Sequence, residues 1–143
     1  MKAPRPIFLA AILLAGVCFL PIAALAEIIQ YRIELKGSNE VPPNNSTGGG
    51  LALLSFDTDS KKLSWVVTYS GLTGPVIGAH LHGTTTAASN AGILVPFRSV
   101  ASPIEGSETL TEAQASGLLA GLWYVNLHTE RHPGGELRGQ IVR

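Results

Sequence analysis

Residues 28–142 alternate between short runs of β-forming residues and loops rich in Gly, Pro, Asn and Ser. Because turn residues interrupt the chain so often, long helices are excluded and an antiparallel all-β fold is favoured. The runs that we predict to be strands are 28–36, 51–56, 63–70, 76–83, 93–97, 122–128 and 136–142. Pro96 predicts that the fifth of these strands lies at a sheet edge, since proline cannot donate a ladder hydrogen bond.

One segment has the pattern of a helix. Thr111 and Gln114 have the spacing of a capping box, good helix formers follow them, and Gly121 is a natural end. We therefore predict an antiparallel sandwich or barrel of about seven or eight strands, with one short helix near 111–120.

Residues 1–26 have the order of charge and hydrophobicity that is typical of a secretory signal. Two basic residues precede an apolar run over 7–20, and a small-x-small sequence ends at Ala26. We expect cleavage there and a protein that is secreted or periplasmic. The alternative is an uncleaved anchor, since about 20 apolar residues span a bilayer, but Pro21 and the Ala-Leu-Ala sequence favour cleavage.

The remaining chain, 27–143, has the length of one domain. Cleavage would remove Cys18, the single cysteine, so the domain has no disulfide framework. Of the ten basic residues, Lys2 and Arg5 lie in the signal, which leaves eight against ten acidic residues. Without a basic patch or charge block, we expect no nucleic-acid partner and no membrane contact after cleavage.

All four histidines lie in the predicted domain, and three have strand positions that suit a metal site. His80 and His82 are two residues apart in one strand, so their side chains share a face. His128 ends a second strand on its polar phase, and His132 follows in the next loop. Neutral imidazoles at such spacing bind Zn or Cu. We predict a metal site of His80, His82 and His128 with His132 as a possible fourth ligand; four unrelated surface histidines are the alternative.

The closing strand adds two charged residues on its polar phase. Glu136 and Arg138 alternate with Leu137, which suggests an exposed ion pair across neighbouring strands. The alternative is that Glu136 accepts a hydrogen bond from a ligating histidine. Trp65 and Trp123 fall on apolar phases and are predicted to lie in the core.

Several of these segments resemble the CHRD family, the domain named after chordin. The segments that carry the resemblance are LKGSNEVPP (35–43), YSGLTGPVIGAHLHG (69–83), LTEAQASGLLAG (110–121) and LWYVNLHTERHPGGELRGQI (122–141). The resemblance implies an extracellular or periplasmic immunoglobulin-like β-sandwich. It does not imply one biochemical activity.

A fainter resemblance links two segments to copper–zinc superoxide dismutases. GLTGPVIGAHLHG is similar to their copper-ligand strand, and LWYVNLH to a strand that supplies a later copper ligand. By this resemblance His80, His82 and His128 correspond to copper ligands, and Arg138 to an arginine that attracts anions. No histidine lies between His82 and His128 and no aspartate follows Asp59, so the expected site is mononuclear.

Three functions follow from these patterns. The first is an exported metal-binding module, with copper preferred over zinc because Cu(II) binds nitrogen ligands more tightly. The second is a copper-only enzyme similar to superoxide dismutase. The third is a module that binds an extracellular protein partner through the loops 37–50 and 84–92, since binding residues concentrate on loops.

Overall fold

The computed structural model describes residues 27–143. The predicted signal over 1–26, with Cys18, lies outside the described residues. Within residues 27–143, no helix has both the length and the hydrophobicity that a membrane span needs.

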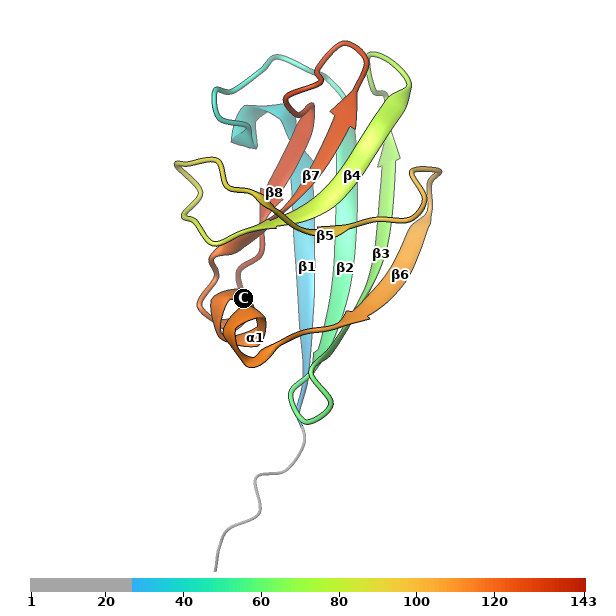
Figure 1. The fold of residues 1–143 in the computed structure, drawn as a ribbon. Helices are drawn as coiled ribbons and strands as arrows, with labels where there is room; N and C mark the ends of the chain where they lie inside the picture. The colour runs from blue at the N-terminus through green and yellow to red at the C-terminus, as the bar shows by residue number, and fades with distance from the viewer. Residues whose placement is uncertain (1–26) are drawn as a thin grey trace, which may run out of the picture.

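Residues 27–143 form eight antiparallel strands, one α-helix and one turn of 3₁₀ helix (Figure 1). The elements are β1 (Ile28–Lys36), η1 (Gly37–Asn39), β2 (Gly49–Asp57), β3 (Lys62–Ser70), β4 (Val76–Gly83), β5 (Ile93–Pro96), β6 (Ile104–Thr109), α1 (Glu112–Leu119), β7 (Trp123–Thr129) and β8 (Leu137–Gln140). Their order in the sheet is β5-β4-β7-β8-β1-β2-β3-β6. The all-β antiparallel fold and the edge position of β5 are confirmed.

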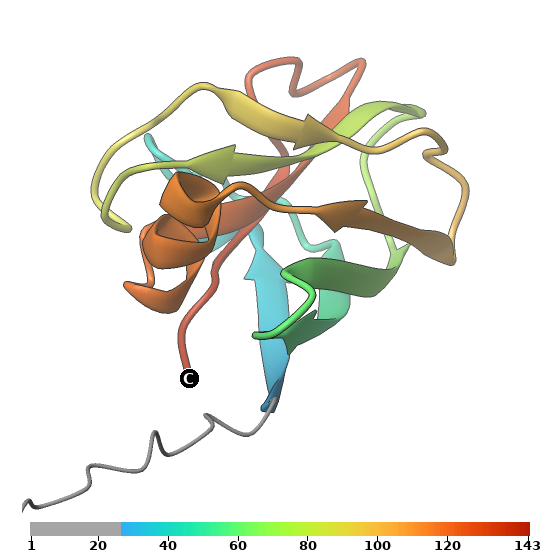
Figure 2. The same cartoon turned by 60° about the horizontal axis from the view of Figure 1, so that its bottom comes forward.

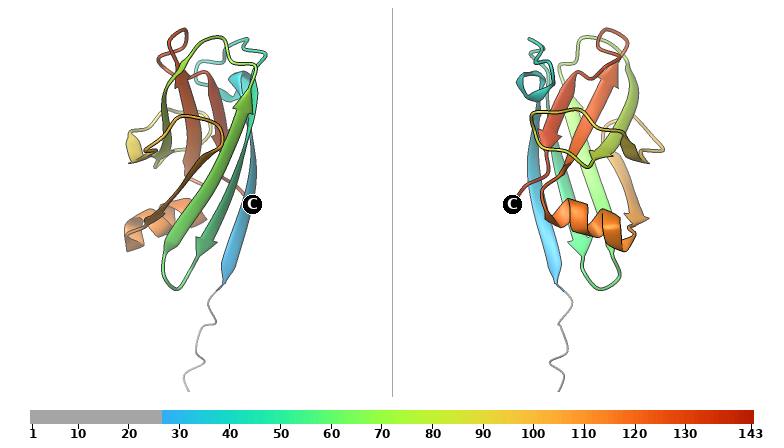
Figure 3. Two further views of the ribbon diagram at one scale, coloured as in Figure 1. Left: turned by 90° about the vertical axis from the view of Figure 1, so that its right-hand side faces the viewer. Right: turned by 60° about the vertical axis from the view of Figure 1, so that its left-hand side comes forward.

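This sheet folds over on itself into a two-layered sandwich, as the side views in Figure 3 show. The sheet passes from one layer to the other between β8 and β1. These two strands are joined by a single residue pair, Lys36 with Arg138. Alternate residues of the strands point inward, as period-2 hydrophobicity requires. The buried core includes Tyr31, Leu35, Leu54, Phe56, Leu63, Trp65, Val67, Leu81, Trp123, Val125, Leu127 and Leu137.

The sequence prediction missed β6 and misplaced one side chain. Along β6 only Ile104 is fully buried, and the other five residues are polar or glycine. Such an edge strand has no apolar alternation to detect. Alternation places Ile77 on the apolar phase of β4 with Ala79 and Leu81, yet Ile77 is exposed, because the β4–β7 register shifts between Val76 and Gly78.

The helix α1 lies beside the sandwich near the C-terminus (Figure 2). It buries Ala115 and Leu118, and it begins with the predicted capping box. The Gln114 backbone N–H donates to Thr111 Oγ1 at 3.2 Å, and the Thr111 N–H donates to Gln114 Oε1 at 2.9 Å.

Replacing Thr111 by alanine is expected to lower the free energy of unfolding by about 1 kcal/mol, because one capping acceptor is lost. Thr111→Ser keeps the hydroxyl and is expected to stay close to wild type. Urea unfolding followed by circular dichroism measures both variants. Equal losses for alanine and serine would show that the methyl group, rather than the cap, is responsible.

Candidate metal centre

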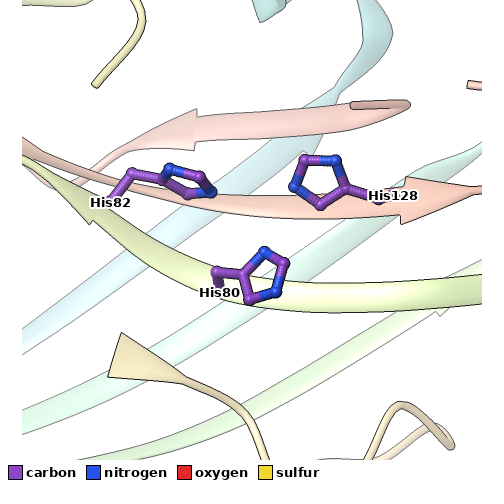
Figure 4. Close-up of side chains that lie close together, drawn as sticks. All are labelled: His80, His82 and His128. Carbon is purple, nitrogen blue, oxygen red and sulfur yellow. The ribbon is translucent and has the colours of Figure 1, made fainter. Parts of the chain in front are cut away.

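Three of the four histidines meet on the outer face of the β5-β4-β7-β8 layer, opposite the apolar core. β4 and β7 are antiparallel neighbours, with Gly78 beside His128 and His80 beside Asn126. Since His80 and His82 alternate with the buried Leu81, both project outward. Figure 4 shows their rings and that of His128 converging on one space. The structure thus brings together the three predicted ligands.

The ring nitrogens of the three histidines lie almost close enough together to bind one metal ion. One ring nitrogen from each histidine lies within 4.8 Å of the others, and the ring centroids are 5.0, 5.5 and 5.8 Å apart. Three nitrogens bound to one ion at 2.0–2.1 Å lie about 3.5 Å apart. Side-chain rotations that bring the nitrogens about 1 Å closer would therefore complete the site.

Two loop carbonyls determine which ring nitrogens are free. His82 Nδ1 lies 2.9 Å from the Ala91 carbonyl oxygen, and His128 Nδ1 lies 2.9 Å from the Pro133 carbonyl oxygen. A carbonyl only accepts, so each Nδ1 carries a proton, and in the neutral ring Nε2 then carries the lone pair. Both Nε2 atoms are buried and have no hydrogen-bond partner among the described residues.

The third free nitrogen belongs to His80. Its Nδ1 is also buried and has no hydrogen-bond partner within residues 27–143. The ring lies over Gly78, where an added Cβ would come within 3.0 Å of His80 Cε1. A glycine at this position lets the ring lie against the strand, and a larger residue would displace it.

The protonation states of His80 and His82 favour binding of a cation. Burial, together with the neighbouring His128 and His82, lowers the pKa of His80 to about 4. Burial also lowers the pKa of His82. These two imidazoles are therefore neutral at pH 7, and binding there does not require the loss of a proton.

His132 is not part of this group. Among the described residues, the triad is the one cluster of three or more metal-ligating side chains close enough to hold an ion. His132 lies in the β7–β8 turn, where its backbone N–H donates to Thr129. Three ligands leave a coordination position open, which suits catalysis or metal transfer better than a closed structural site.

The polar side of β7 and β8 is buried, which the sequence did not predict. Two loops contact β8 on this side: Asn39 of loop 37–48 donates to the Arg138 carbonyl, and the Arg138 guanidinium donates to the Ser89 carbonyl of loop 84–92. The loops also contact each other, since Asn90 donates to the Val41 carbonyl at 2.7 Å. Figure 1 shows both loops beside this end of the sheet. Tyr124, Asn126 and Arg138 are each no more than 3% exposed. This layer thus packs an apolar core on one side and a polar cluster on the other.

Arg138 packs behind one ligand of the triad. Its guanidinium lies 3.6 Å from the Tyr124 ring centroid, and that ring stacks on His82 at 4.8 Å and 4°. The guanidinium donates to Asn90 Oδ1 and to the carbonyl oxygens of Ser89 and Thr86. Because Arg138 is buried and its donors are occupied by a loop, it does not have the exposed position that attracting anions would require.

Glu136 forms neither of the contacts proposed for it from the sequence. It is fully buried, so the exposed ion pair with Arg138 is wrong, and carbonyls rather than Glu136 hold His82 and His128. Its carboxylate accepts instead from Ser46 Oγ, Thr129 Oγ1, and both the N–H and Oγ1 of Thr73, at 2.6–2.9 Å. Burial acts to raise the pKa of Glu136, but these hydrogen bonds outweigh it and hold the pKa below its usual value.

Glu40 is a second buried acid that sequence analysis missed. It accepts a hydrogen bond from Asn126 Nδ2 and borders two surface cavities, of about 590 and 490 Å³. Burial raises its pKa to about 7, although Asn126 and the charge of Arg138 act against this rise. Its place in a Pro- and Asn-rich loop gave no periodic signal from which burial could be predicted.

Comparison with known proteins identifies the family. The family model of the CHRD domain matches residues 31–141, which include most of the chain and the entire triad. Searches of curated proteins and of solved structures gave no match, so the similarity to superoxide dismutases remains a resemblance of two short segments. On the extent of the family match, the chain belongs to the CHRD domain family.

Proposed function

We propose that this CHRD protein is exported and binds a single metal ion, copper in preference to zinc, through His80, His82 and His128. The observation that carries the proposal is the set of three buried ring nitrogens without hydrogen-bond partners, on rings that converge on one space. Unpaired buried polar atoms are costly, and a metal ion would satisfy all three at once. Copper is preferred because Cu(II) forms the more stable complexes with nitrogen ligands.

Each histidine would have a defined part in binding. His82 and His128 would bind through Nε2 while their Nδ1–H groups donate to loop carbonyls, and His80 would bind through Nδ1. Bound copper would supply a one-electron redox centre with an open coordination position. Export rests on the sequence of residues 1–26, and it would deliver the triad to a compartment in which copper is encountered.

Metal analysis of the exported protein tests the proposal. After dialysis against a mild chelator, the wild-type protein is expected to retain close to one copper or zinc per chain. His82→Ala is expected to weaken copper binding more than about a hundredfold, since a site with one ligand removed keeps only two of its three bonds. His132→Ala is the matched control and is expected to leave the affinity unchanged.

The same samples give a second measurement. Electron paramagnetic resonance of the Cu(II) form is expected to show coupling to several nitrogens, and His80→Ala is expected to reduce it. Wild-type protein without copper or zinc above background would refute the proposal. Equal loss of binding in His132→Ala would refute this choice of ligands.

A further inference from the structure

The His82 ligand belongs to a stack that ends in a buried positive charge. Tyr124 lies between the His82 imidazole, 4.8 Å away and nearly parallel, and the Arg138 guanidinium, 3.6 Å away. The register explains the stack. Tyr124 on β7 pairs with His82 on β4 and with Gln140 on β8, and Arg138, two residues before Gln140, lies on the same face of β8. A cation bound at the triad would therefore be repelled by the charge of Arg138.

The hydrogen bonds of Arg138 do not neutralise it. Its partners are the Asn90 side-chain oxygen and two backbone carbonyls, all uncharged. Within residues 27–143, no carboxylate lies within 4.0 Å of its guanidinium nitrogens. Glu40 interacts with it at longer range, which weakens the field of Arg138 without removing it.

The ligands themselves add no negative charge. Histidines in many metal sites donate to carboxylates, which makes the imidazole a stronger donor. Here His82 and His128 donate to the uncharged carbonyls of Ala91 and Pro133. Because the three ligands are neutral, a half-buried site with Cu(II) would carry a net charge of +2, whereas the same site with Cu(I) would carry +1.

From this arrangement we infer that the site prefers Cu(I) to Cu(II), and that Arg138 is the positioning residue that sets the preference by placing its charge behind Tyr124. The inference rests on the proposed metal-binding function and specifies the oxidation state of its ion. It concerns an equilibrium between two bound states, and it requires no reaction partner beyond the reductant or electrode used to measure it.

The size of the effect follows from distance. The His82–Tyr124 and Tyr124–Arg138 distances place a unit charge about 8 Å from the His82 ring. At an effective dielectric constant of about 20, such a charge changes the equilibrium between bound Cu(II) and bound Cu(I) by more than tenfold. Solvent at the half-buried triad and the more distant Glu40 reduce this value. We therefore expect Arg138 to contribute about tenfold to the ratio of the Cu(II) and Cu(I) dissociation constants, which corresponds to about 59 mV.

The reduction potential of copper-loaded protein tests the inference. Spectroelectrochemistry of wild type, Arg138→Gln and Arg138→Lys gives the potential, and competition with a Cu(I)-specific chelator gives the Cu(I) affinity. Arg138→Gln removes a charge that repels Cu(II) twice as strongly as Cu(I). The variant is therefore expected to lower the potential by about 59 mV and to tighten Cu(II) binding more than Cu(I) binding, whereas Arg138→Lys keeps the charge and is expected to stay close to wild type. Arg32→Gln removes the same charge from the exposed face of β1 and is the matched control.

The outcomes separate this inference from the proposed function. Wild-type protein that binds no copper refutes both. Copper binding with an unchanged potential in Arg138→Gln refutes the inference alone, and so does an equal shift in Arg138→Lys, because that result would assign the effect to the hydrogen bonds with loop 84–92. If Arg138→Gln does not fold, the wild type still decides, since tighter binding of Cu(II) than of Cu(I) at pH 7 contradicts the preference.

Discussion

Replacing Glu136 by alanine is expected to lower the free energy of unfolding by about 3–5 kcal/mol, because several buried donors lose their acceptor together. The carboxylate joins three parts of the chain that are distant in sequence. Ser46 lies in the loop before β2, Thr73 in the loop before β4, and Thr129 at the end of β7. Urea unfolding of the wild type and the variant at pH 7 measures the difference.

Two variants separate this effect from a general loss of a side chain. Glu136→Gln keeps one acceptor oxygen and is expected to lose less stability than the alanine variant. Glu130→Ala removes an exposed acid from the neighbouring turn and is expected to change stability by less than about 0.5 kcal/mol. A loss below about 1 kcal/mol in Glu136→Ala would contradict the four hydrogen bonds.

The pH dependence of this contribution has a definite sign. The folded-state pKa of Glu136 is lower than its unfolded value, so the ionised form binds its donors and stabilises the fold. The contribution is present above the unfolded pKa near 4.5 and is lost as the pH falls through the folded pKa. Wild-type protein should therefore lose stability below about pH 4.5 more steeply than Glu136→Gln.

Glu40→Gln is expected to stabilise the protein at pH 8 and to change little at pH 4. The folded-state pKa of Glu40 is raised from 4.5 to about 7, so folding favours the protonated acid. That stabilisation is complete below the unfolded pKa and is lost as the pH rises through the folded pKa. A shift of this size corresponds to about 3 kcal/mol between pH 4 and pH 8.

The test compares unfolding free energies of the two proteins across this pH range. Glutamine can accept the same hydrogen bond from Asn126 but carries no charge at any pH, so the variant curve should be flatter by up to about 3 kcal/mol. Glu34→Gln is the control, because Glu34 is exposed and Lys36 holds its pKa below the usual value. Parallel curves for wild type and Glu40→Gln would show that Glu40 is ionised in the folded protein.

The faces of the strands could be predicted because side chains alternate with period two. That rule places His80 and His82 on one face, and the antiparallel pairing of β4 with β7 brings His128 beside them. It also placed Trp65 and Trp123 in the core, as the structure confirms. The predicted triad therefore required only the phase of two strands and their adjacency.

The surroundings of the triad could not be predicted, because loop conformation follows no periodic pattern. Alternation assigned Glu136 and Arg138 to a polar face and suggested exposure, yet both are buried. Glu136 binds Ser46 of loop 37–48, and Arg138 binds loop 84–92. The carbonyls that orient His82 and His128 belong to Ala91 and Pro133, and nothing in those residue types indicates a role at a metal site. Here the strands supply the ligands and the loops supply their environment.

The carbonyls of Ala91 and Pro133 have an evolutionary consequence. They hold the rings of His82 and His128 through backbone atoms, which every amino acid possesses, so substitutions at these two positions preserve the hydrogen bonds as long as the loop path is kept. Insertions or deletions in either loop would alter the donor strength and orientation of the histidines while leaving the histidines in place. If the triad binds metal as proposed, relatives that share the three histidines could thus differ in metal affinity through loop length alone.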